Sequence, residues 1–178
     1  MPRFIALLRG INVGGNKLVP MARLRALLEQ LGHSAVATLL QSGNAVFTAK
    51  AKPAALEKQL SAAIAAEFGF EVAVLVRSRD ELAAAVAANP LAGAEQAPSR
   101  FVIFFLSAAP DPKLLAALDP AAYAPDEFRA VGREIYARFP NGINQSKLAI
   151  ALGGKRLGVI PTARNWATVN KLLALADA

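Results

Sequence analysis

Glycines and basic residues occur together in the segment from Arg9 to Lys17, which follows an apolar stretch and precedes an expected helix. Glycines allow backbone amides to point toward a ligand, and a helix N-terminus favours an anion, so such a segment can bind phosphate. The spacing is not that of a P-loop: alignment on Gly10 and Gly15 leaves Lys17 one residue late, with Leu18 in place of the magnesium-binding hydroxyl. It is not the G-x-G-x-x-G pattern either. A long turn that needs glycine for its backbone geometry explains the segment equally well.

A second polar segment runs from Gln41 to Asn44, at the tip of an expected hairpin. It offers two side-chain amides and the Ser42 hydroxyl. A tight turn that needs positive φ is sufficient to explain a Ser-Gly or Gly-Asn pair at this place. The interpretation of Gly43 and its neighbours as turn residues is therefore favoured. Gln41 is the exception, because a polar side chain at the end of a buried strand often faces a site.

The third segment contains Ser146 and Lys147, on a helix expected over about 145–152. Adjacent helical residues point roughly 100° apart, so Lys147 is badly placed to activate Ser146 as a nucleophile. A phosphate contact by either side chain is easier to build. A solvated lysine at the start of a helix is the plainer interpretation.

The fourth segment, Thr162 to Trp166, lies at the expected opening of the last helix. Thr162 is a good N-cap, which would place Arg164 and Asn165 in the first turn beside exposed amides that suit an oxyanion or phosphate. Trp166 has Val169 and other apolar residues behind it at helical spacing. This spacing favours the core over a base-stacking role for Trp166.

Several chemistries are excluded by composition. The chain has no cysteine and one histidine, His33, which removes disulfides, thiolate catalysis, cysteine-ligated metals and paired catalytic histidines. The four segments contain no carboxylate for general acid–base work, and Asp126, Glu127 and Glu134 are interpreted as ordinary hairpin charges. The sequence therefore leans against an enzyme and predicts no cofactor and no metal.

Basic residues are concentrated near both ends of the chain. Five lie in residues 1–28 and six in residues 135–176, with no acid in either range, so the net charge of +7 is +11 from these ranges and −4 from the remainder. If the fold brings the ends together, it forms a cationic surface that attracts phosphates, nucleic acid or other anions. A basic surface without a ligand is the alternative.

Hydrophobic periodicity predicts the arrangement of the elements. Strands at 4–8, 36–40, 45–48 and 70–76 and helices opened by Pro20 and Pro53 give the order β-α-β-β-α-β, which is ferredoxin-like. Ser78 and Glu81 form a capping box for a third helix. The second half repeats the order, with at most a short strand at 157–160 before a final helix capped by Thr162. We predict an α+β protein of two ferredoxin-like halves with antiparallel sheets, at 1–77 and 100–178, joined by a helix and linker at 78–99.

No membrane association is expected. The longest run of bulky apolar residues, 101–106, is too short to span a bilayer, and the N-terminus lacks the features of a signal peptide. We therefore predict a soluble cytoplasmic protein. The sequence does not determine its oligomeric state.

Four stretches in this order, LLRGINVGGNKLVPM, QSGNAVF, SKL and TARNW, resemble the uncharacterised, mainly bacterial family called domain of unknown function 1697, over Phe4 to Leu173. The resemblance implies a small α+β protein with ferredoxin-like halves and no assigned activity. A threonine commonly follows SKL in the family pattern, whereas Ala149 stands here, so no role for a hydroxyl is carried over at that position. The family motif positions implied are Arg9, Gly10, Asn12, Gly14, Gly15, Gln41, Ser42, Gly43, Asn44, Ser146, Lys147, Thr162, Arg164, Asn165 and Trp166.

Most of these motif residues are polar or glycine, which is more typical of a site than of a core. We expect them to converge on one anion-binding cleft between the halves, with amides of Gly14, Gly15 and the helix start at Thr162. Its charge partners would be Arg9, Lys17, Lys147 and Arg164. The expected ligand is phosphorylated or otherwise anionic, either a nucleotide-like metabolite or nucleic acid. Sequence-specific RNA binding is disfavoured because the basic-aromatic RNP pattern is missing.

Two alternatives belong to other classes. An enzyme acting on a small anionic substrate would use Lys147 or Ser146, with Arg9 and Arg164 as clamps, and would need a carboxylate or a strongly perturbed lysine in the same cleft. A protein–protein interaction module would use apolar sheet faces or the alanine-rich helices. Self-association without any response to phosphates would favour this last class.

Overall fold

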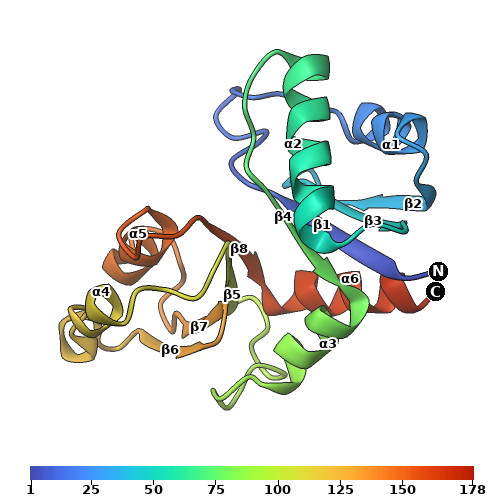
Figure 1. Ribbon diagram of the computed structural model, residues 1–178. Coiled ribbons are helices and arrows are strands. Elements are labelled where there is room, and N and C mark those ends of the chain that lie inside the picture. The colour runs from blue at the N-terminus through green and yellow to red at the C-terminus, as the bar shows by residue number, and fades with distance from the viewer. The chain divides into compact units, whose positions relative to one another are not determined.

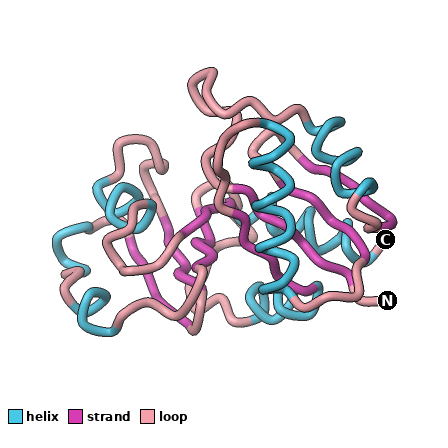
Figure 2. The backbone as a smooth tube through the Cα atoms, turned by 45° about the horizontal axis from the view of Figure 1, so that its top comes forward, coloured by secondary structure: helices cyan, strands magenta, loops and turns pink.

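The computed structural model describes all 178 residues, which form two compact units. The first unit comprises Met1–Ala84 and Lys171–Ala178, and the second comprises Ala85–Asn170. Each unit contains one four-stranded antiparallel sheet with helices, as Figures 1 and 2 show. None of the helices combines the length and hydropathy that a membrane crossing requires.

The first unit has the predicted ferredoxin-like topology, with strand order β2-β3-β1-β4. Pro53 opens α2, and Gly69 ends it with a left-handed φ of 79°. One face of the sheet packs against leucines of α1 and α2 that recur at helical spacing. The elements are β1 (Arg3–Leu8), α1 (Met21–Gln30), β2 (Ser34–Leu39), β3 (Asn44–Thr48), α2 (Pro53–Phe68) and β4 (Val74–Ser78).

The end of the chain is attached to the first unit by two arginines. The Arg3 guanidinium donates hydrogen bonds to the carbonyls of Leu175 and Ala176, at the end of α6 (Trp166–Asp177). Arg79 forms an ion pair with Asp177 at 2.6 Å, which raises the pKa of Arg79 and lowers that of Asp177. Carbonyls at a helix C-terminus carry partial negative charge, so these cations stabilise the last turn of α6.

The second unit repeats this topology, with strand order β6-β7-β5-β8. Its core lies between one face of the sheet and α5, where Phe104 and Ile135 pack with Leu148 and Leu152. The elements are β5 (Phe101–Leu106), α4 (Pro112–Ala116), a 3₁₀ helix η1 (Pro120–Tyr123), β6 (Glu127–Val131), β7 (Glu134–Arg138), α5 (Lys147–Gly153) and β8 (Pro161–Asn165).

The two sheets also share their register. Ile5 of β1 pairs with Arg77 of β4, and Ile103 of β5, at the equivalent position, pairs with Arg164 of β8. In both units a polar residue that ends the fourth strand caps the next helix. The prediction of two ferredoxin-like halves in an α+β protein is therefore confirmed.

These caps are Ser78 and Asn165. Ser78 accepts the Glu81 amide at 3.1 Å and begins α3 (Arg79–Ala87), while the Glu81 carboxylate accepts the Ser78 amide at 2.8 Å, which confirms the predicted capping box. Asn165 accepts the amide of Thr168 at 2.8 Å at the start of α6.

The prediction for the last strand was wrong. Residues 157–160, expected as a short strand, contain a turn in which Gly158 has a φ of 74°. The strand is Pro161–Asn165, so Thr162 does not cap a helix and Arg164 is not in a first turn. Pairing of β8 with β5 overrides the local N-cap signal of Thr162, because completing the sheet satisfies a whole row of backbone groups.

Candidate functional site

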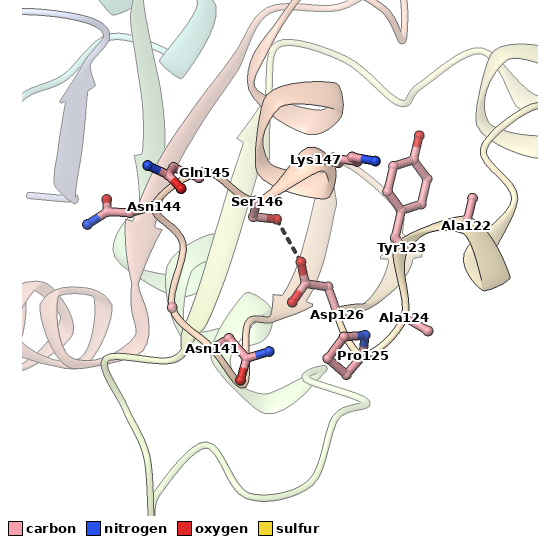
Figure 3. Close-up of a pocket in the computed structure, with 11 residues that line it drawn as sticks. Ala122, Tyr123, Ala124, Pro125, Asp126, Asn141, Asn144, Gln145, Ser146 and Lys147 are labelled. Carbon is pink, nitrogen blue, oxygen red and sulfur yellow. Dashed lines mark hydrogen bonds between the residues drawn. The ribbon is translucent and has the colours of Figure 1, made fainter.

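The second unit contains a polar pocket of about 330 Å³, lined by residues 122–126, 141–142 and 144–147 (Figure 3). The first segment leads from η1 through a cis Ala124–Pro125 bond into β6. The second connects β7 to α5. Since β6 and β7 are antiparallel, the start of one strand lies beside the end of the other, and the hairpin brings both segments to the same end of the sheet.

A hydrogen bond between side chains joins the two segments. The Ser146 hydroxyl donates to Oδ2 of Asp126 at 2.7 Å, drawn as the dashed line in Figure 3. The same Oγ accepts the amide of Ala149 at 3.1 Å and so caps α5. Ser146 is only 9% exposed. Its hydroxyl thus donates one hydrogen bond and accepts one, whereas Oδ1 of Asp126 accepts none within the protein.

Other polar side chains of the pocket form no hydrogen bond or ion pair within the protein, although the Tyr123 ring contacts Phe128. Lys147 makes no hydrogen bond or ion pair, and Figure 3 shows its side chain extending toward Tyr123. Asn141 lies on the Asp126 side of the pocket. The lining side chains that bond to nothing in the protein are those of Tyr123, Asn141, Asn144, Gln145 and Lys147.

The backbone beside this pocket is strained. Gln145 has a φ of 63°, which a residue with a Cβ adopts at a cost of about 1 kcal/mol or more. Asn12, Lys17 and Leu40, which lie in or beside the first two motif segments, also have positive φ. Such backbone conformations cluster at functional sites, and four of the five non-glycine residues with positive φ lie in or beside three of the four segments that the sequence singled out. The fifth, Ala35, lies in β2.

The first glycine-rich segment forms a protruding hairpin, residues 12–17, that we call the glycine finger. The Asn16 amide bonds to the Val13 carbonyl at 3.0 Å, and between them Gly14 and Gly15 have φ values of 60° and 76°. Two consecutive positive φ angles define a type I′ turn, which glycines form readily. The turn geometry thus explains both glycines, as the structural interpretation of this segment predicts.

The glycine finger is tied to the segment from Gln41 to Asn44 by the Asn12 side chain. Its amide nitrogen donates to the carbonyls of Val19 at 3.0 Å and Gln41 at 2.7 Å, and its oxygen accepts the Val19 amide at 2.8 Å. Gly43 lets the two segments approach, since a Cβ there would lie 2.6 Å from Ile11 Cδ1. These motif residues therefore hold the fold of the first unit together.

Asn44 has a similar role at the start of β3. It is fully buried, and its amide nitrogen donates to the Leu39 carbonyl at 2.7 Å and to the Ser42 hydroxyl at 3.0 Å. Of the polar segment from Gln41 to Asn44, the Asn44 side chain therefore points into the protein. Gln41 is exposed, and its side chain makes no hydrogen bond.

The four predicted charge partners differ in their surroundings. Lys17 is exposed and donates to the Glu71 carbonyl at 2.9 Å, and Arg9, next to Gly10 at the end of β1, is half-buried. Arg164 is 7% exposed and donates to Thr162 Oγ1 and the Ala163 carbonyl, and burial lowers its pKa to about 10.

Arg164 and Lys147 lie on opposite sides of the second sheet. Ala163 packs into the same core as Leu148 of α5, and successive residues of a strand face opposite sides, so Arg164 points away from α5. The structure does not bring these two cations together within the unit. A single cleft that draws on both halves stays a prediction.

Trp166 is a core residue, 5% exposed, as its helical spacing indicates. Its indole N–H donates to the Glu95 carboxylate at 3.1 Å. It is therefore not available as a stacking platform for a base.

Sequence reasoning missed Asp126, which it treated as an ordinary hairpin charge, and gave Tyr123 no role. The only signal in the sequence is that Asp126 immediately precedes the first strand of a hairpin whose second strand leads into the Ser146 segment. To infer from it that Asp126 and Ser146 meet, one needs the register of the hairpin, which the sequence does not specify.

Comparisons with known proteins agree with this fold. The model of a family described as protein of unknown function, DUF1697, matches residues 1–136. No functionally curated protein matches the chain. A solved structure, that of the conserved bacterial protein SP0830 from Streptococcus pneumoniae, is 25% identical, covers 100% of this chain and 99% of that chain, and superimposes with a TM-score of 0.76.

Proposed function

The chain belongs to DUF1697, a family of proteins of unknown function, and we propose that it binds a small phosphorylated or other anionic ligand in the pocket of the second unit. The observation that carries the proposal is the ammonium group of Lys147, which lines a polar pocket and has no partner in the protein. Lys147 is exposed, and an unpaired cation binds an anion without first breaking an internal ion pair.

Two further observations support a small ligand. The pocket volume of about 330 Å³ is at the lower end of the range of roughly 300 to 1,000 Å³ that is usual for small-molecule sites. The net charge of +7 attracts anions in general and raises their rate of association. Nucleic acid would need an extended basic groove rather than a pocket of this size.

The test is calorimetric titration of the whole protein with inorganic phosphate, phosphate monoesters, nucleotides and a short RNA, at low and moderate salt. Lys147→Met should weaken binding of a phosphate monoester about tenfold, because it removes one charge-assisted contact. Lys50→Met is the matched control, since it removes the same charge from an exposed loop of the first unit. Equal weakening by both variants, or binding of RNA alone, contradicts the proposal.

A second candidate is an enzyme acting on a small anionic substrate. It is favoured by the hydrogen bond of 2.7 Å between Ser146 and the Asp126 carboxylate, in the pocket that Lys147 also lines. A carboxylate that accepts from a hydroxyl is one arrangement that activates a nucleophile. Release of inorganic phosphate from phosphate monoesters tests this candidate. Ser146→Ala should abolish turnover while binding persists, and a wild-type protein that binds these esters without turnover rejects it.

A further inference from the structure

We infer that the ligand of this pocket carries hydroxyl groups next to its anionic group, as a sugar phosphate or another polyol phosphate does. The inference rests on the proposed function and adds the substrate class to it. It follows from the presence of opposite charges, Lys147 and Asp126, in one small pocket.

Asp126 selects against a ligand that is only an anion. Its carboxylate lines the pocket, and no basic side chain pairs with it. An anion placed near it is repelled, most strongly where water is scarce. Since Oδ2 already accepts from Ser146 and Oδ1 accepts nothing, a ligand gains most by donating a hydrogen bond to Oδ1. A hydroxyl group supplies such a donor without adding charge.

The remaining lining groups also suit hydroxyls. The Asn141 amide and the Tyr123 hydroxyl each donate and accept, as a hydroxyl does, and neither is bonded within the protein. Lys147 donates only and is the natural partner of the phosphate. An ammonium-bearing ligand is less well matched, because the pocket offers it a single carboxylate that already accepts one hydrogen bond.

The decisive experiment compares glycerol 1-phosphate with propyl phosphate by calorimetric titration of the whole protein. The two share a three-carbon chain and a phosphate monoester, and they differ only in two hydroxyls. We expect the wild-type protein to bind glycerol 1-phosphate about tenfold more tightly, which is the effect of one hydrogen bond to a charged group. Ethanolamine phosphate is the third ligand, a phosphate monoester with a two-carbon chain that carries an ammonium group and no hydroxyl.

Variants should separate the roles of the two charges. Asp126→Asn keeps the shape of the side chain and removes its charge, so propyl phosphate should bind more tightly and the preference for glycerol 1-phosphate should fall several-fold. Lys147→Met should weaken the binding of glycerol 1-phosphate and of propyl phosphate by the same factor. If Asp126→Asn proves unstable, Asn141→Ala removes a lining group that supports no other residue, and it should reduce the preference for glycerol 1-phosphate several-fold.

Each other outcome overturns a distinct statement. Equal binding of glycerol 1-phosphate and propyl phosphate overturns the hydroxyl inference and leaves the proposed anion site intact. Tighter binding of ethanolamine phosphate than of glycerol 1-phosphate also overturns it, in favour of a zwitterion. Binding of none of the three, together with no binding of inorganic phosphate, overturns the proposed function itself.

Discussion

Asn12 and Asn44, two motif residues of the first unit, are occupied with the fold, whereas the motif residue Lys147 of the second unit lines a pocket and is available. Asn12 makes three hydrogen bonds to backbone groups, and Asn44 is buried and bonded on both sides of its turn. Lys147 makes none, and neither does Asn141, a pocket residue outside the motif segments. Polar motif residues in one chain thus serve two purposes, and the bonding of each side chain distinguishes a structural role from an available one.

The difference between the units lies in their loops rather than in their sheets, which share strand order and register. Four residues, 49–52, connect β3 to α2 in the first unit, while residues 139–146 connect β7 to α5 in the second. The longer connection and the segment that leads into β6 together line the pocket. The first unit instead has its long connection after β1, where the glycine finger lies. A repeated fold therefore does not imply a repeated site.

The largest expected effect tests the structural role of the first unit. Gly43→Ala should destabilise the protein by about 3 kcal/mol, because it combines an unfavourable φ of 91° with a Cβ 2.6 Å from Ile11 and 2.8 Å from Leu8. Gly132→Ala, in the equivalent hairpin of the second unit, has nothing within 4 Å of its Cβ and should cost only about 1 kcal/mol. Urea unfolding measures both. Equal losses would mean that backbone strain alone decides the cost.

A pair of asparagine variants sharpens the comparison directly. Asn12→Ala should reduce the free energy of unfolding by about 2 kcal/mol, since it leaves backbone groups of Val19 and Gln41 without their partner. Asn141→Ala should change it by less than about 0.5 kcal/mol and should weaken ligand binding instead. A destabilised Asn141→Ala protein would show that the pocket residues also support the fold.

A smaller effect concerns alkaline pH. Tyr136 occupies the position in the second sheet that Val46 occupies in the first, and burial raises its pKa to about 12. A tyrosine whose pKa is raised by folding stabilises the protein below its unfolded pKa of about 10, and this contribution is lost as pH rises toward 12.

The alkaline effect can be isolated with Tyr136→Phe. This variant should lose the hydrogen bond to the Ala85 carbonyl at neutral pH and should lose stability less steeply between pH 10 and 12. Unfolding in urea at a series of pH values measures both the loss of stability at neutral pH and its slope between pH 10 and 12. The same slope in wild type and variant would assign the alkaline loss to other groups.

Local signals predicted most elements but not the last strand. Pro53 and Gly69 bracket α2, and Ser78 with Glu81 caps α3, because each acts within one turn of its own helix. Thr162 carries an equally good local signal for a helix start, yet it lies in β8. The register of β8 depends on β5, which is about 60 residues away in sequence, and no local pattern reports such pairing.

The sequence by itself determined two ferredoxin-like halves, the core position of Trp166 and the four polar segments, because hydrophobic periodicity and turn chemistry act over a few residues. Only the tertiary structure decided which of these segments line a pocket and which are turned inward. Asp126 and Ser146 are 20 residues apart and meet because the β6–β7 hairpin closes between them, whereas Asn12 is turned inward by Val19 and Gln41. The partners of a side chain depend on which strand ends lie next to one another in the sheet. Pairing between strands that are distant in sequence sets this arrangement.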